Sequence, residues 1–270
     1  MNYHSDKWIM EQLNRHYQEA LKLYSSDRII GVFCQGSQNY GLDTPNSDID
    51  TKCIVTPTWE ELCLNKKPVS TTHILDNEEH LDAKDIRLYI QCFQKQNLNF
   101  LEILFTPYAL INPMYTSSWS LLMDNNEAIA QYNPFRAVKT MKGIAMEKYH
   151  ALKHPYPSKL DILAKKGYDP KQLHHLLRVE EYLSRYINGE PYACCLMPRD
   201  TEYLVKVKEG LYDLNKAEEV ADASLQATTE MADKFCESHL DQQDPNVDKL
   251  FLEVQEKIMR TAITKELNNK

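Results

Sequence analysis

The feature that most constrains this chain is a pair of short apolar runs, residues 28–34 and 48–55, with a Gly-Ser turn directly after the first. Both runs have the length and composition of buried strands. Asp48 and Asp50 open the second run, and side chains two residues apart point to the same face of a strand. Carboxylate oxygens are ligands that Mg²⁺ prefers, and a small turn lets backbone N–H groups approach phosphate. The pattern therefore predicts a metal site beside a phosphate-binding turn.

Each part of this pattern also has an ordinary interpretation. An isolated Asp-x-Asp is most often a solvated face, and an isolated Gly-Ser is a plain turn. The combination is more specific, because Ser37 is followed eleven residues later by Asp48, between two predicted strands. Lys52 lies on the same predicted strand face as the aspartates. It would counter their charge or contact phosphate, or it would be an exposed strand lysine.

The run GSQNYGLDTPNSDID at residues 36–50 resembles the signature of the DNA polymerase β-type nucleotidyltransferase superfamily. More narrowly, it is similar to the RNA-repair-associated nucleotidyltransferases, which show GS, then YG, then a proline and SDID. Three later segments resemble the same family: HLDAKDIR at 80–87, NLNFLEIL at 97–104 and KQLHHLLR at 171–178. The likeness covers about residues 28–190.

The resemblance implies an enzyme, a nucleotidyltransferase that moves NMP from an NTP such as ATP to an acceptor hydroxyl and releases pyrophosphate. It implies two Mg²⁺ or Mn²⁺ ions held by three carboxylates, of which Asp48 and Asp50 are two. The third carboxylate is expected on an adjacent strand, and Asp82 in Leu-Asp-Ala fits best. Asp85 is the alternative, although its place before an apolar helix also predicts a helix N-cap. The neighbouring pair at 78–79, both glutamates, is predicted to be a solvated turn.

The same resemblance implies which residues bind the nucleotide. Gly36 and Ser37 would receive the β- and γ-phosphates, with the hydroxyl and amide of Ser37 in contact with them. Ser47 would orient the metal ligands through hydrogen bonds without binding the metal itself, or would simply belong to the turn.

A second group of basic residues lies far along the chain. Lys171, His175 and Arg178 are spaced i, i+4 and i+7, so they share one face of a predicted helix. Such a face suits the phosphates of a nucleotide or an RNA, and it equally suits plain solvation. The neighbouring His174 lies off this face and is predicted to pack.

The order of predicted elements indicates an α+β protein. A polymerase β-like nucleotidyltransferase domain with a short mixed or antiparallel sheet is expected over residues 1–112, and an all-helical C-terminal domain over 113–270. Segment 200–245 is predicted either as helices or as a flexible surface. The principal helices are predicted at 5–24, 86–96, 136–153, 170–188 and 245–267.

Composition narrows the class of protein. The chain has 270 residues, 43% of them apolar, and its seven cysteines form no CxxC pair. A disulfide scaffold and a zinc ribbon are therefore not expected. The polar start, which lacks a signal peptide, and the absence of a membrane-length apolar run predict a cytoplasmic protein with no membrane partner. The net charge of −8 disfavours an enzyme that tracks along nucleic acid and makes long products.

The acceptor remains open at this stage. The resemblance makes an RNA end, such as a tRNA end, the first acceptor to test, and a protein hydroxyl or a small molecule is the alternative. A toxin or phage-defence enzyme that modifies tRNA or protein would use the same chemistry. A module that binds nucleotide without turnover is the hypothesis from another class. The pattern does not indicate a protein partner.

Overall fold

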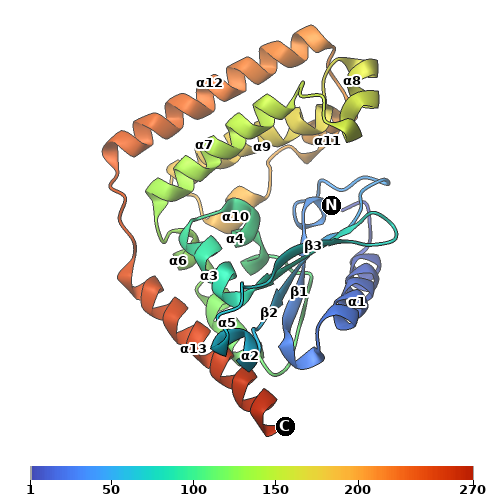
Figure 1. The fold of residues 1–270 in the computed structure, drawn as a ribbon. Helices are drawn as coiled ribbons and strands as arrows, with labels where there is room; N and C mark the ends of the chain where they lie inside the picture. The colour runs from blue at the N-terminus through green and yellow to red at the C-terminus, as the bar shows by residue number, and fades with distance from the viewer. Residues whose placement is uncertain (1, 270) are drawn as a thin grey trace. The chain divides into compact units, whose positions relative to one another are not determined.

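The computed structural model describes residues 2–269, and the chain divides into two compact units. One unit runs to Tyr132 and takes up the chain again from Gln243, and the other is Asn133–Gln242. Figure 1 shows the strands together in the first unit and long helices in the second. The sheet-plus-helix content confirms the predicted α+β class.

A five-stranded mixed sheet forms the centre of the first unit, in the order β3-β4-β2-β1-β5. Strands β2 and β4 are parallel, and the other neighbours are antiparallel. The strands are β1 (Ile29–Gln35), β2 (Asp50–Val55), β3 (Ser70–Ile74), β4 (His80–Asp85) and β5 (Ala109–Ile111).

Helix α1 (Asp6–Leu23) covers one face of this sheet and contacts β1, β2 and β5 (Figure 1). Ile9 and Leu13 of its apolar stripe are fully buried, and β1 and β2 beneath it are almost continuously buried. Burial on this scale is the main source of stability of such a layer. The interior of the first unit therefore fixes the strands that carry the candidate site.

The other helical segments of the first unit follow the sheet or surround it. The C-terminal helix α13 packs against α5, α3 and α2, so the end of the chain returns to the first unit. These segments are η1 (Ser26–Arg28), η2 (Ser37–Asn39), α2 (Trp59–Cys63), α3 (Ile86–Gln94), α4 (Leu98–Leu101), η3 (Glu102–Leu104), α5 (Thr116–Asp124), α6 (Asn126–Ala130) and α13 (Pro245–Asn268).

Helices joined by turns and loops make up the described residues of the second unit. Helix α9 is its centre and contacts α7, α10, α11 and α12, with Leu173, Leu176 and Leu183 fully buried. Segment 200–245 is mainly helical, which settles that open prediction. The helices are α7 (Pro134–Ala151), η4 (Pro157–Lys159), α8 (Leu160–Lys166), α9 (Pro170–Ile187), α10 (Tyr192–Leu196), α11 (Thr201–Glu209) and α12 (Leu214–Ser238).

The predicted division into domains 1–112 and 113–270 stays a prediction. Compactness groups residues by contact, whereas a domain boundary is tested by independent folding.

Candidate functional site

The Gly-Ser turn and the aspartate pair lie at the same end of the sheet. Strand β1 ends at Gln35, whose register partner on antiparallel β2 is Asp50. The turn at 36–37 therefore begins directly beside the start of the carboxylate strand. Gly36 has φ +101 and ψ −149, a conformation that side-chain-bearing residues rarely adopt.

The two aspartates differ in their surroundings. Strand β2 begins at Asp50, and Asp48 lies two residues before it with an exposed side chain. The Asp50 carboxylate accepts a hydrogen bond at Oδ1 from the His80 backbone N–H (3.0 Å), and the His80 ring nitrogen Nδ1 lies 3.1 Å from the same oxygen. Both carboxylates thus remain accessible at the start of the strand.

Asp82 shares a sheet face with Asp50, because Asp82 pairs in register with Lys52, two residues beyond Asp50. Its carboxylate accepts from Lys52 Nζ at 2.6 Å and from the Thr72 hydroxyl at 3.3 Å. The same ammonium lies 4.7 Å from the centre of the Phe100 ring. Lys52 is therefore a buried counterion of Asp82, and the prediction of an exposed strand lysine is wrong.

Asp85 is committed to local structure, as predicted. It is the N-cap of α3, where its carboxylate accepts from the Arg87 backbone N–H at 2.8 Å. It also forms a two-point ion pair with the Arg87 guanidinium (2.9 and 2.8 Å). The Asp85 side chain is only 1% exposed, whereas that of Asp82 is 20% exposed, so Asp82 is the better candidate for a third carboxylate.

Ser37 and Ser47 occupy turns. Ser47 Oγ accepts from the Thr44 backbone N–H at 2.9 Å, and the Ser47 N–H donates to the Thr44 carbonyl at 2.9 Å. This closes the turn that leads into the aspartates. Ser37 Oγ lies 3.5 Å from the side-chain oxygen of Gln38. The predicted roles of both serines toward phosphate and metal stay predictions.

Two residues that the sequence did not single out for the site form hydrogen bonds with the backbone of the Asp-Ile-Asp segment. Gln38 Nε2 donates to the Asp48 carbonyl at 2.7 Å, and Glu79 Oε1 accepts from the Ile49 N–H at 3.2 Å. Glu79 is only 6% exposed, so the prediction of a solvated turn is wrong for this residue. No local sequence signal marks Glu79, because its partners Arg15 and His16 lie on α1, far away in the sequence.

Glu79 belongs to a buried polar network. His16 Nε2 lies 2.8 Å from Glu79 Oε2 and His16 Nδ1 lies 2.8 Å from the Thr51 hydroxyl, while the Arg15 guanidinium pairs with the same carboxylate. Burial acts to raise the pKa of Glu79, but hydrogen bonds from Asn77, His16 and Ile49 outweigh it and lower that pKa overall. The carboxylate is therefore ionised at neutral pH, directly behind the aspartate strand.

The donor chemistry of this end of the sheet suits a hard cation. Asp48, Asp50 and Asp82 supply carboxylate oxygens, which are the ligands of Mg²⁺ and Mn²⁺. Across residues 2–269, however, no group of three or more His, Cys, Asp or Glu side chains is arranged to hold a metal ion. Lys52 supplies positive charge beside Asp82.

The basic residues of the second unit share the predicted face of α9. Lys171 is exposed in its first turn, and His175 and Arg178 are partly buried. Burial, followed by the charges of His174 and Arg178, lowers the pKa of His175 well below its ordinary value. At neutral pH the positive charge of this face therefore comes from Lys171 and Arg178, with His175 as a neutral imidazole.

The packing role predicted for His174 is confirmed. Its ring is buried, and its Nδ1 lies 2.8 Å from the Leu204 carbonyl, to which it donates. Burial is also the main cause that lowers its pKa to about 4.

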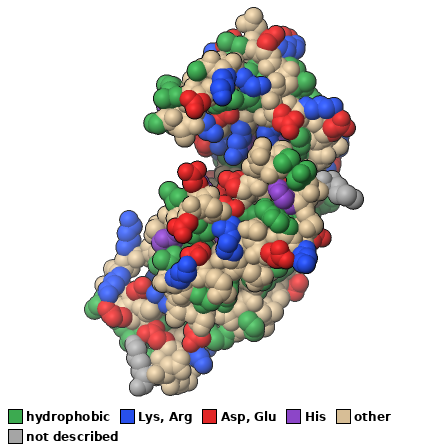
Figure 2. Space-filling view, turned by 90° about the vertical axis from the view of Figure 1, so that its right-hand side faces the viewer, with side chains coloured by type: hydrophobic (Ala, Val, Ile, Leu, Met, Phe, Trp, Pro, Cys, Tyr) green, Lys and Arg blue, Asp and Glu red, His purple; other side chains and the backbone are tan. Residues whose placement is uncertain are grey.

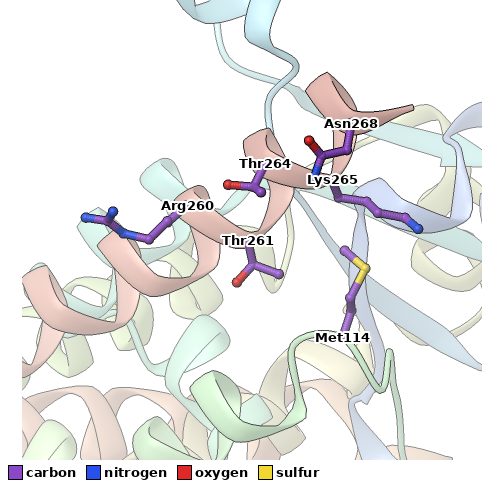
Figure 3. A pocket seen from close by; sticks show the side chains of 6 residues that line it. All are labelled: Met114, Arg260, Thr261, Thr264, Lys265 and Asn268. Atoms are coloured by element: carbon purple, nitrogen blue, oxygen red, sulfur yellow. The ribbon is translucent and has the colours of Figure 1, made fainter. Parts of the chain in front are cut away.

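A shallow pocket on the first unit lies away from the carboxylates (Figure 3). Strand β5 is antiparallel to β1, and the Asn112 N–H donates to the Ile30 carbonyl, so the chain near Met114 lies at the start of β1. The Gly-Ser turn follows the other end of that strand. The pocket is lined by Met114, Arg260, Thr261, Thr264, Lys265 and Asn268.

Comparison with known proteins identifies the family. The chain belongs to the RNA repair pathway DNA polymerase beta family, which matches residues 6–184. A solved nucleotidyltransferase-like protein from Exiguobacterium sibiricum 255-15 is similar at 12% identity, over 83% of this chain and 75% of that chain, with a TM-score of 0.32. No curated protein matches the chain. The family match confirms the resemblance read from the Gly-Ser and Asp-Ile-Asp motifs.

Within residues 2–269, each helix is too short or too polar to cross a bilayer.

Proposed function

We propose that this protein is a metal-dependent nucleotidyltransferase that transfers NMP from an NTP to the hydroxyl of an acceptor, with an RNA end as the first acceptor class. The hydroxyl oxygen would form a bond to the α-phosphorus, the bond from that phosphorus to pyrophosphate would break, and the hydroxyl proton would pass to solvent. Family membership supports the class of reaction, and the words "RNA repair pathway" in the family description support RNA as acceptor.

The observation that carries this proposal is the register of β1 and β2. Gln35 faces Asp50, so a turn able to receive phosphate begins beside two accessible carboxylates. Phosphate-binding groups next to carboxylates form the arrangement that nucleotidyl transfer requires, because cations must neutralise a triphosphate and its leaving pyrophosphate.

Asp48 and Asp50 would hold Mg²⁺ or Mn²⁺, and Asp82 would complete the set once its carboxylate leaves Lys52. When bound, two such ions would supply charge neutralisation and an activated hydroxyl. Lys52, released from Asp82, would remain beside the site as a phosphate partner. At the turn, the nucleotide would be bound by Gly36, Ser37 and Ser47.

The α9 face of the second unit would bind phosphate of the nucleotide or of RNA through Lys171 and Arg178. His175 would contribute as a neutral hydrogen-bonding group. Acidic and basic side chains are interspersed over the face in Figure 2, and the net charge of −8 favours local contact at an RNA end over binding along a strand.

Label transfer tests this function. Purified protein would be incubated with each of the four NTPs labelled at the α-phosphate, with Mg²⁺ or Mn²⁺ and a whole-cell extract. The expected result is label in RNA, removed by ribonuclease, with one preferred NTP. An Asp48→Asn/Asp50→Asn double variant, which keeps the side-chain size, should lose at least about 100-fold of the transfer.

The outcomes separate the alternatives. Label in protein or in a small molecule would keep nucleotidyl transfer and replace the acceptor class. Growth arrest on expression that the double variant relieves would indicate a toxin or defence role. Nucleotide binding without transfer under every condition would contradict the enzyme and support a binding module.

A further inference from the structure

One peptide group at the aspartate pair is held by side chains at both of its polar atoms. The carbonyl of Asp48 and the N–H of Ile49 belong to the same peptide. Gln38 donates to that carbonyl (2.7 Å), and Glu79 accepts from that N–H (3.2 Å). Both side chains come from outside the strand and are buried, at 2% and 6% exposure.

The position of this peptide explains why it needs side-chain partners. Strand β2 and its ladder begin at Asp50, so the preceding peptide lies beyond the paired part of the sheet. Ile49 itself is fully buried. Buried backbone polar groups require hydrogen-bond partners, and the loss of a partner is destabilising. Gln38 and Glu79 supply the hydrogen bonds that the strand ladder does not provide for this peptide.

Each partner is itself fixed. The Gln38 backbone carbonyl accepts from Asn2 Nδ2 at 2.7 Å, and Gln38 lies in η2, next to the Gly-Ser turn. Glu79 is held by His16 (2.8 Å) and by the Arg15 guanidinium, both from α1. The peptide therefore joins the phosphate-binding turn on one side to the interior of the unit on the other.

We propose that Gln38 and Glu79 are positioning residues that set the orientation of the Asp48 carboxylate relative to the Asp50 carboxylate by fixing the peptide between them. Rotation of that peptide would turn Asp48, which lies before the strand, while Asp50 stays anchored in the ladder. Hydrogen bonds that fix the supports of metal ligands commonly raise metal affinity about 10- to 100-fold. This proposal rests on the proposed function, because the two carboxylates must be metal ligands for it to hold.

The first test removes the Gln38 donor and keeps the side-chain volume, in Gln38→Met. The matched control is Gln96→Met, because Gln96 is a buried glutamine of the same unit, 1% exposed, whose Nε2 also donates to backbone carbonyls (2.9 and 2.8 Å). Binding of Mn²⁺ alone is measured by electron paramagnetic resonance. The expected result is about tenfold weaker binding in Gln38→Met and less than a twofold change in Gln96→Met.

The second test uses rescue at the other atom of the peptide. Glu79→Gln keeps an oxygen that can accept from the Ile49 N–H, whereas Glu79→Met does not. The expected result is Mn²⁺ affinity within about threefold of wild type for Glu79→Gln and about tenfold weaker for Glu79→Met. The Ile49 amide proton, followed by hydrogen exchange, should stay protected in Glu79→Gln and lose protection in Glu79→Met.

The results distinguish this proposal from the proposed function. If wild-type Mn²⁺ binding depends on Asp48 but Gln38→Met binds as well as Gln96→Met, the positioning role is overturned and the metal site stands. If wild type binds no Mn²⁺, or binds it without dependence on Asp48, the metal-site part of the proposed function fails and the positioning role fails with it.

Discussion

The residues of the site differ in whether their partners are near in sequence. Asp85 meets Arg87 two positions later, so its capping role follows from local spacing. Glu79 meets Arg15 and His16 on a distant helix. Its burial depends on how α1 covers the sheet, and no pattern around position 79 reports that. Local spacing therefore predicted the capping role of Asp85 correctly, but it predicted a solvated position for Glu79, which is buried.

Substitution of Gly36 should destabilise the protein because of the backbone conformation at this position alone. An added Cβ would have open space, since its nearest neighbour, the Gln38 side-chain oxygen Oε1, lies 4.0 Å away, but φ is +101. We expect Gly36→Ala to lower the free energy of unfolding by about 1–2 kcal/mol in urea denaturation. Gly143→Ala is the control, because Gly143 lies inside α7 with no atom within 4 Å of the added Cβ. That change should raise stability by up to about 1 kcal/mol; equal effects of the two variants would contradict the strain at Gly36.

His174 should make the protein sensitive to mild acid. Its pKa falls from 6.5 to about 4, so its contribution is complete above pH 6.5 and is lost as the pH falls toward 4. Between pH 7 and pH 5 this residue should remove about 2 kcal/mol of stability. In His174→Asn, the amide can still donate to Leu204. Between pH 7 and pH 5 this variant should therefore lose about 2 kcal/mol less stability than wild type. Titration of His174 near pH 6.5 by NMR would refute this expectation.

At the scale of elements, periodicity and end signals predicted most of the fold. The helices predicted at 5–24, 170–188 and 245–267 are observed with each end within one residue. The carboxylate strand begins at Asp50 rather than at residue 48, because the pairing with β1 ends at Gln35 and the turn follows. Sheet order was not predictable, because ladder partners such as β2 and β4 are separated by a whole strand in the sequence.

Helix α13 should stabilise the first unit through one buried ring. Phe251 is 1% exposed and packs against Phe93 and Tyr132, with ring centres 6.2 and 5.6 Å apart. We expect Phe251→Ala to lower the free energy of unfolding by about 3–5 kcal/mol. The adjacent Leu252 is 70% exposed, so Leu252→Ala should change stability by no more than about 0.5 kcal/mol. Similar losses in both variants would show that α13 does not pack as described.

At the scale of the whole molecule, the motif and the family match agree on the class of protein. The family match spans residues 6–184, and so includes the sheet, the carboxylates and most of α9. The signature at 36–50 was enough to predict this class, because spacing and residue type are written directly in the sequence. The ion pair between Lys52 and Asp82 was not predictable, since it depends on the register of two strands.

Parallel reactions with α-labelled and γ-labelled NTP test nucleotidyl transfer at Asp48 and Asp50. The α-label should enter RNA while the γ-label appears only in released pyrophosphate, and Asp48→Asn/Asp50→Asn should abolish both. Entry of γ-label into the acceptor would show phosphoryl transfer instead. Equal incorporation by wild type and the double variant would contradict the assignment of the site.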